Sequence, residues 1–169
     1  TCPAGKFQNS DGQSSCESCW PGSFNTGEGL FTCKLCLAGS YNIYNASTSC
    51  VGCAKGDFQQ SAGKTQCTAC NPGRYSNVPG VSACSNCIPG TFTNTSQMSH
   101  CYDCGVGTSQ SLPQASSCAD CLVGKFQDLK GRPACLPCSA GEFQNGTKST
   151  GCFTCSAGTV QPQVGMTTC

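Results

Sequence analysis

The chain has 169 residues, of which 20 are cysteine and only 10% are charged, and its formal net charge is +1. The nine basic residues are scattered singly among eight acidic ones, which argues against nucleic acid or an anionic membrane surface as a partner. The cysteine content is typical of a disulfide scaffold, and no apolar run has the length of a membrane span, so we expect little conventional core and no membrane insertion.

The cysteines recur with a period of 17 residues, without an insertion or deletion, in ten copies of the pattern C-x-x-G-x-[FY]-x8-C-x-x. The predicted repeats are 2–18, 19–35, 36–52, 53–69, 70–86, 87–103, 104–120, 121–137, 138–154 and 155–169. A unit this short cannot bury a core of its own, so we expect each repeat to stack on its neighbours.

Three further positions of the repeat carry structural information. The fourth residue is glycine in all ten copies, which predicts a positive φ or a backbone contact with no room for a Cβ atom. The sixth is aromatic in eight copies, with Ser109 and Val160 as exceptions, and we expect Leu112 or Pro113 to fill the space beside Ser109. The eleventh is glycine in six copies, which predicts a turn between two short extended legs.

Three fates of the sulfur atoms are consistent with the spacing. Zinc binding would use C-x2-C-x13-C-x2-C groups, but the nine C-x-x-C pairs plus the single Cys2 and Cys169 cannot all be grouped in fours. A redox-active C-x-x-C would need a low-pKa thiolate at a helix N-terminus, and nothing in the sequence predicts such a helix. Structural disulfides are the remaining fate, and we expect neither metal nor cofactor.

Three disulfide schemes remain open, because connectivity cannot be deduced from sequence alone. Bonds between neighbouring repeats would leave unpaired sulfurs at the ends, and bonds inside C-x-x-C would leave the long loops open. The register favours pairing inside the repeat, which uses every cysteine. The predicted bonds are Cys2 with Cys16, Cys19 with Cys33, Cys36 with Cys50, Cys53 with Cys67, Cys70 with Cys84, Cys87 with Cys101, Cys104 with Cys118, Cys121 with Cys135, Cys138 with Cys152 and Cys155 with Cys169.

The predicted fold class is a small disulfide-rich, mostly irregular and β structure, an elongated solenoid-like rod of ten 17-residue single-disulfide units. One disulfide and one buried ring cannot offset the entropy of ordering a whole repeat, so we expect each aromatic ring to lie against a disulfide or the adjacent repeat. Because binding surfaces are usually built by loops of varied length, ten loops of equal length favour a regular superhelix or a filament.

Three N-glycosylation sequons are present, at Asn45, Asn94 and Asn145. They fall in repeats 3, 6 and 9, which predicts a 51-residue super-repeat that returns the glycans to one face. Gln8, Gln59, Gln110 and Gln161 at the seventh position of repeats 1, 4, 7 and 10 share this rhythm, although drift among similar units would explain it equally well. The sequence begins at Thr1 without a signal peptide, and we expect it to be a segment of a longer secreted or surface protein.

The strings "CPAGKFQNSDGQSSCESC" and "CSAGEFQNGTKSTGCFTC" resemble the cysteine-rich repeat of ephrin receptors and the single-disulfide half-module of the tumour necrosis factor receptor family. The resemblance implies a bond from first to second cysteine and a C-shaped loop with two legs. This chain differs from those receptors in having no two-disulfide modules and no changes of spacing. Long uniform arrays of this type look more like surface proteins of protists and algae, including the shafts of flagellar hairs.

No catalytic constellation is predicted, because the only histidine, His100, has no triad partners in the pattern and the carboxylates fall at varying repeat positions. Asp103 and Asp120 share a position directly before a cysteine and could form a calcium or salt-bridge ladder. The aromatic residues outside the repeated position could cover an interface between chains or pack on their own stack. They are Trp20, Phe31, Tyr44, Tyr102 and Phe153.

The function expected from the sequence is that of an extracellular structural segment, a glycosylated, disulfide-stapled rod or filament shaft, and not an enzyme. Its expected partners are further copies of itself or other fibre proteins, besides its N-linked glycans. The alternative is a ligand-binding or adhesive stalk of a cell-surface receptor.

Overall fold

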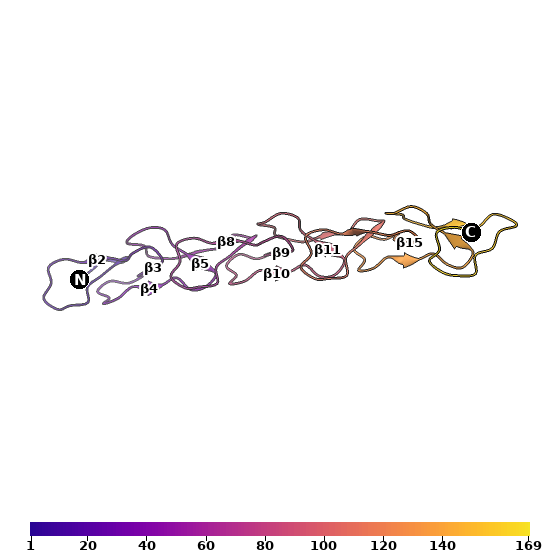
Figure 1. Ribbon diagram of the computed structural model, residues 1–169. Coiled ribbons are helices and arrows are strands. Elements are labelled where there is room, and N and C mark those ends of the chain that lie inside the picture. Colours follow the sequence, from indigo (N-terminus) through magenta and orange to yellow (C-terminus); the bar gives the residue numbers. More distant parts are fainter. The chain divides into compact units, whose positions relative to one another are not determined.

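The computed structural model describes residues 1–169 and consists of short β-strands joined by turns and bends (Figure 1). No helix is present, and so none that could cross a bilayer. Each of the first nine repeats forms one two-stranded hairpin from its fifth and sixth and its last two residues. The hairpins are β1 (Lys6–Phe7) with β2 (Glu17–Ser18), β3 (Ser23–Phe24) with β4 (Lys34–Leu35), β5 (Ser40–Tyr41) with β6 (Val51–Gly52), β7 (Asp57–Phe58) with β8 (Thr68–Ala69), β9 (Arg74–Tyr75) with β10 (Ser85–Asn86), β11 (Thr91–Phe92) with β12 (Tyr102–Asp103), β13 (Thr108–Ser109) with β14 (Ala119–Asp120), β15 (Lys125–Phe126) with β16 (Leu136–Pro137), and β17 (Glu142–Phe143) with β18 (Phe153–Thr154).

A tight turn precedes the fifth residue of every repeat, where the first strand of the first nine repeats begins. In repeat 1 the N–H of Lys6 donates to the carbonyl of Pro3 at 3.0 Å, and Gly5 between them has a φ of 80°. This is the conformation that a type II turn requires at its third residue, and an L-residue adopts it only with strain. The same hydrogen bond and a positive φ recur in all ten repeats, so the predicted positive φ of the fourth residue is confirmed.

A second turn occurs at the eleventh residue, which has a positive φ in every repeat whether or not it is glycine. Ala46, Gln97, Gln114 and Lys148 occupy this position with φ between 53° and 64°. The turn predicted from glycine is thus also present in the four repeats that lack glycine. In these repeats the backbone adopts a left-handed conformation that costs about 1–2 kcal/mol for an ordinary residue.

Ala46→Gly is therefore expected to stabilise the chain by up to about 1 kcal/mol, because glycine relieves the left-handed strain and loses only part of that gain to its larger unfolded-state entropy. Ala46 is the cleanest of the four positions, since its side chain has no polar group to lose. Ala62→Gly is the matched control, because Ala62 also lies in a turn but has no positive φ, and it should lower stability by a few tenths of a kcal/mol. Urea unfolding midpoints measure both effects, and a loss of stability in Ala46→Gly would contradict the prediction.

The core of the structure is a series of sulfur atoms. Apart from Phe7, every buried apolar residue is the first cysteine of a repeat, with 6% exposure for Cys2 and at most 1% for the others. These others are Cys19, Cys36, Cys53, Cys70, Cys87, Cys104, Cys121 and Cys138. The disulfides therefore serve both as covalent closures of the loops and as the apolar interior.

The aromatic rings of the sixth position are half-buried, except for buried Phe7. The edge-on ring contact of Phe7 with Trp20 at 5.7 Å reaches the next repeat, as expected. In repeats 6 and 9, however, the ring contacts lie inside one hairpin, from Phe92 to Tyr102 and from Phe143 to Phe153. These contacts were not predicted from the sequence, and they arise because the sixteenth residue lies directly opposite the sixth in the hairpin.

Repeat 7 keeps its hairpin although Ser109 replaces the aromatic residue, with Ser109 opposite Ala119. The Ser109 hydroxyl lies 3.2 Å from the Cys135 sulfur of the next repeat. Leu112 is 67% exposed and Pro113 is exposed, so the prediction that one of them fills the vacated space is wrong.

The chain divides into two units. The first consists of residues 1–70, 75–85 and 97–99, and the second of residues 71–74, 86–96 and 100–169.

Candidate functional site: the step from one repeat to the next

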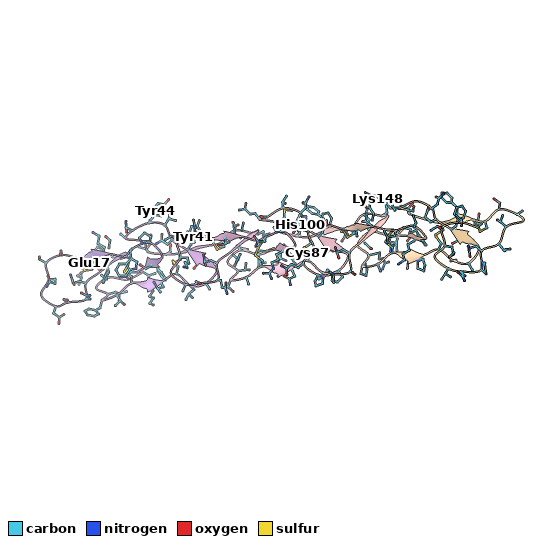
Figure 2. All side chains as sticks on the ribbon, in the orientation of Figure 1. Glu17, Tyr41, Tyr44, Cys87, His100 and Lys148 are labelled. Atoms are coloured by element: carbon cyan, nitrogen blue, oxygen red, sulfur yellow. A yellow bond between two sulfur atoms is a disulfide. The ribbon has the colours of Figure 1, made fainter.

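Ten disulfides close the ten loops, each joining the first cysteine of a repeat to the second across 14 positions. The Cα atoms of the bonded pairs are 5.6 to 5.8 Å apart. No cysteine is left free, so no thiolate remains for zinc or for redox chemistry. In the first nine repeats the first cysteine of the bond is buried, as for Cys87 (Figure 2), whereas in repeat 10 Cys155 is half-buried. The second cysteine of each bond is half-buried or exposed.

The glycine of the fourth position makes two of the hydrogen bonds that join a repeat to the next. The N–H of Gly22 donates to the carbonyl of Asn42 at 2.7 Å, and the carbonyl of Gly22 accepts from the N–H of Cys36 at 2.9 Å. Both partners belong to the following repeat. The same pair of bonds recurs at each of the nine steps.

Two more backbone bonds join the loops. The N–H of Asn25, at the seventh position, donates to the carbonyl of Ser47 at 3.1 Å, and the N–H of Ala46 donates to the carbonyl of Cys19 at 2.7 Å. These bonds also recur at all nine steps, which gives four backbone hydrogen bonds per step. The second bond holds the left-handed turn of repeats 2 to 10 against the preceding repeat, because its donor is the N–H of the eleventh residue.

A close contact reaches beyond the adjacent repeat. A Cβ atom placed on Gly22 would lie 2.2 Å from the carbonyl oxygen of Gly63, which is the eleventh residue two repeats further along. The same contact, at 2.0 to 2.2 Å, recurs for the fourth-position glycine of the first eight repeats. Gly141 and Gly158, in the last two repeats, have nothing within 4 Å of that point. The contact therefore couples each repeat to the second one after it.

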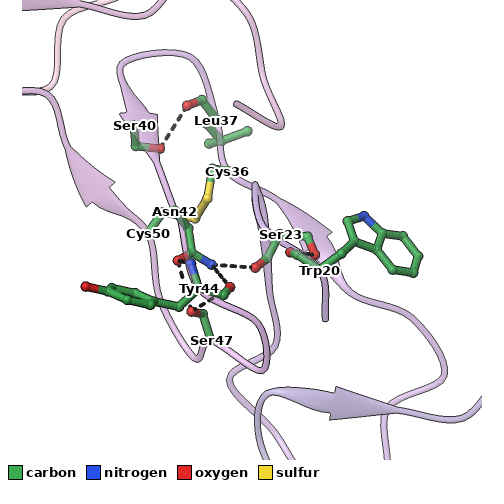
Figure 3. Close-up of a disulfide and its surroundings, with 9 residues drawn as sticks. All are labelled: Trp20, Ser23, Cys36, Leu37, Ser40, Asn42, Tyr44, Ser47 and Cys50. Carbon is green, nitrogen blue, oxygen red and sulfur yellow. Dashed lines mark hydrogen bonds between the residues drawn. A yellow bond between two sulfur atoms is a disulfide. The ribbon is translucent and has the colours of Figure 1, made fainter. Parts of the chain in front are cut away.

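The side chain of the seventh position is polar and mostly buried, and it binds backbone groups that the hairpin leaves free. In repeat 3 the amide of Asn42 donates to the carbonyl of Ser23 in the preceding repeat at 2.9 Å and accepts from the N–H of Tyr44 and the hydroxyl of Ser47 (Figure 3). The longer glutamine instead spans its own loop, as in repeat 8, where Gln127 donates to the carbonyl of Ala134 at 2.7 Å.

Six repeats have this glutamine arrangement, at Gln8, Gln59, Gln110, Gln127, Gln144 and Gln161. Because repeats 8 and 9 carry it as well as repeats 1, 4, 7 and 10, the glutamine does not mark a three-repeat rhythm. The side chain is explained by its bonds across the loop. The predicted super-repeat thus retains only the sequons of repeats 3, 6 and 9 as support.

The titratable residues singled out in the sequence lie on the surface. His100 is exposed and packs its ring edge-on against Tyr102, with centroids 4.7 Å apart. Asp120 forms an exposed ion pair with Lys148 at 3.7 Å, a salt bridge to the second repeat after its own. No group of three or more His, Cys, Asp or Glu side chains is placed to hold a metal ion.

The predicted glycosylation residues Asn45, Asn94 and Asn145 all have exposed side chains. Of the off-phase aromatic residues, Phe31 and Tyr44 are 66% and 69% exposed, whereas Trp20, Tyr102 and Phe153 each contact a sixth-position ring. Three of these five rings thus pack against other rings of the same chain.

The sequence did not predict which group the fourth-position glycine contacts, namely the carbonyl of the eleventh residue two repeats further along. Glycine in all ten copies did predict a close backbone contact, but the repeating pattern carries no information on which residue makes it. The sequence gives one indication of the eleventh residue's special conformation: it is glycine in six repeats, which is consistent with its left-handed φ.

Residues 42–83 match the family model described as tyrosine-protein kinase ephrin type A/B receptor-like. The match covers most of repeat 3, all of repeat 4 and most of repeat 5. No curated protein matches the chain significantly. The family match and the density of disulfides indicate an extracellular module, secreted or at a cell surface. With ten regularly spaced disulfides, the chain is an array of tandem cysteine-rich repeats that resemble the ephrin-receptor-like module.

Proposed function

We propose that this chain is a structural segment of an extracellular protein, in which the repeats act as a stiff spacer or as the shaft of a fibre. The observation that supports the proposal is the uniform set of contacts that joins each repeat to those that follow. Four backbone hydrogen bonds and one close glycine contact recur at the same repeat positions, between loops of identical length. Uniform steps are what a spacer needs, because its length is then set by the number of repeats.

The contact between repeats two apart supports stiffness in particular. Bonds between adjacent repeats restrain one joint at a time. A contact such as that of Gly39 with the carbonyl of Gly80 restrains two successive joints together, because bending at either would separate or compress it. The half-buried Asp57 side chain accepts a hydrogen bond from Gln97 at 3.0 Å, again two repeats apart. Bending therefore has to break bonded and packed groups in several repeats.

An adhesive or ligand-binding stalk is the second candidate, supported by exposed apolar side chains in repeats 2 and 3. Leu37, Tyr44 and Phe31 are 75%, 69% and 66% exposed. Exposed apolar side chains offer surface that a partner can cover with a gain in apolar burial. Self-association with further copies, or association with other fibre proteins, would use the same kind of surface, and the low charge of the chain would not oppose it.

Electron microscopy of individual purified molecules tests the structural role. We expect extended particles of uniform length and low curvature, and reduction of the disulfides should convert them to compact or irregular chains. Flexible particles with a broad spread of end-to-end distances would overturn the spacer proposal. Sedimentation velocity at increasing concentration then distinguishes a lone spacer from a fibre-forming shaft.

The triple variant Phe31→Ser/Leu37→Ser/Tyr44→Ser separates the two candidates. A structural role predicts unchanged particle length and curvature in this variant. An adhesive role predicts that binding of the intact chain to cells or surfaces is lost while the particle is unchanged.

A further inference from the structure

Two of the three sequons stand beside an aromatic pair. Asn94 and Asn145 occupy the eighth position of repeats 6 and 9, two residues after the sixth-position rings of Phe92 and Phe143. The sixteenth position is aromatic in these two repeats and in no other, as Tyr102 and Phe153. An extra ring thus occurs only where a sequon follows the sixth-position ring by two residues.

The extra ring lies directly across the hairpin from the first. Phe92 is opposite Tyr102 and Phe143 is opposite Phe153 in the strand register. The ring centroids are 6.3 Å apart in repeat 6 and 5.7 Å in repeat 9, and the rings are tilted by 50° and 43°. Tyr102 and Phe153 are still 45% and 56% exposed, so each pair presents apolar ring surface to water.

The asparagines of these two sequons are exposed, whereas the residue between ring and asparagine is buried. Thr93 and Gln144 are 0% and 4% exposed, while Asn94 and Asn145 are exposed. Continuing the extended course of β11 and β17 by two residues puts the sixth and eighth side chains on one side of the chain. A residue diagonal to a cross-strand partner lies about 7–8 Å away, within reach of a large side group. In repeat 9 the exposed face of Phe153 also lines a surface depression together with Gln144 and Thr150.

We propose that N-linked glycans on Asn94 and Asn145 pack their first N-acetylglucosamine against the Phe92–Tyr102 and Phe143–Phe153 ring pairs. The proposal rests on the predicted glycosylation of the chain. A pyranose ring has a face of C–H groups, and placing this face on an aromatic ring removes apolar surface of both from water. Because the sugar is covalently attached two residues from the ring, it is present at high effective concentration.

Asn45 is a built-in control. It lies at the tenth position of its repeat, in a turn, and Ile43 occupies the eighth position instead. The sixteenth residue of that repeat is Val51, which stands opposite Tyr41, so no ring pair is present. A sugar on Asn45 has no comparable surface to cover.

The test uses the full chain from a eukaryotic secretory host, trimmed enzymatically to one N-acetylglucosamine per site. Asn45→Gln/Asn94→Gln leaves only the site at Asn145, and Asn94→Gln/Asn145→Gln leaves only Asn45. Each variant is compared with the same variant from a host without N-glycosylation. We expect the sugar to raise the thermal midpoint by about 2–4 °C at Asn145 and to leave it unchanged at Asn45.

Phe153→Thr is the matched ring variant, because Thr68 occupies the same position in repeat 4. This change should abolish the shift caused by the sugar at Asn145. In proton NMR spectra the N-acetyl methyl signal should move upfield at Asn145, through the ring current, but not at Asn45 or in Phe153→Thr. Equal sugar effects at both sites, or an effect at Asn145 that survives Phe153→Thr, would overturn the proposal.

Mass spectrometry of the untrimmed chain separates this proposal from its premise. Sugar on Asn45 with none on Asn94 and Asn145 would overturn the packing proposal alone. No sugar at any site would overturn the predicted glycosylation as well, whereas the spacer proposal, which is tested by particle length, would stand.

Discussion

Gly124→Ala is expected to destabilise the chain by about 1–3 kcal/mol more than Gly141→Ala, because only the first forces a methyl group into a packed backbone. A Cβ atom on Gly124 would lie 2.0 Å from the carbonyl oxygen of Gly165, whereas one on Gly141 would have no neighbour within 4 Å. The two glycines have similar φ values, 76° and 83°, so both variants share the strain of a left-handed alanine.

The hydrogen bonds of the two glycines are matched as well. The N–H of Gly124 donates to Gln144 and that of Gly141 to Gln161, each at 2.7 Å, and both carbonyls accept from the next repeat at 2.9 Å. The difference between the two variants therefore reports the contact between repeats two apart.

Urea unfolding gives the two losses of stability, and amide hydrogen exchange gives their location. In Gly124→Ala we expect faster exchange at the N–H of Gly165, which donates to the carbonyl of Cys138 at 2.8 Å in the native chain. Equal losses in both variants would mean that the backbone near Gly165 yields at little cost, and the argument for stiffness from this contact would fail.

The sequence predicted those features of the fold that depend on residues within a single repeat. A period of 17 residues placed the hairpins and turns, and a glycine in every copy predicted the positive φ at positions such as Gly22. The step between repeats was not predictable, since every repeat has the same pattern and nothing in it specifies the rotation from one to the next. The partner of Gly22, the carbonyl of Gly63, follows from that rotation.

The eleventh position shows a limit of reading turns from glycine. Lys148 and Gln97 adopt the same left-handed conformation as the glycines of other repeats, and in both the N–H donates to the first cysteine of the preceding repeat. The contacts between repeats thus accommodate a conformation that the local preference of these residues does not predict. Ring contacts were missed for a related reason, since the period placed Tyr102 and Phe153 outside the aromatic position although they lie directly opposite it.

Cys53→Ala/Cys67→Ala is expected to cost about 2–5 kcal/mol of stability, because it removes both a loop closure and part of the sulfur core. Cys53 is fully buried, its carbonyl accepts from Gly80 at 2.8 Å and its N–H donates to Gly39 at 2.8 Å, so the loss should reach the repeats on both sides. Alanine is preferred to serine here because it leaves no buried hydroxyl without a partner.

Cys155→Ala/Cys169→Ala is the matched control, since it opens a loop of the same length, with the same sequence separation of 14, but Cys155 is only half-buried and Cys169 is exposed. The loop-closure contribution is then equal in the two double variants, and the difference is the packing of the interior sulfur. We expect a smaller loss in the control, confined to repeats 9 and 10.

In the Cys53→Ala/Cys67→Ala variant, trypsin cleavage measures how readily repeat 4 opens. The cleavage sites follow Lys55 and Lys64, which are both exposed in repeat 4. Faster cleavage at these lysines should be accompanied by faster hydrogen exchange in repeats 2 to 6, because the native contacts extend two repeats in each direction. Loss of protection along the whole chain would contradict this range, and would mean that the array unfolds as one cooperative body instead of through coupling between near neighbours. Loss of protection confined to repeat 4 would also contradict the expected range of coupling. The contact between repeats two apart would then contribute nothing to stability.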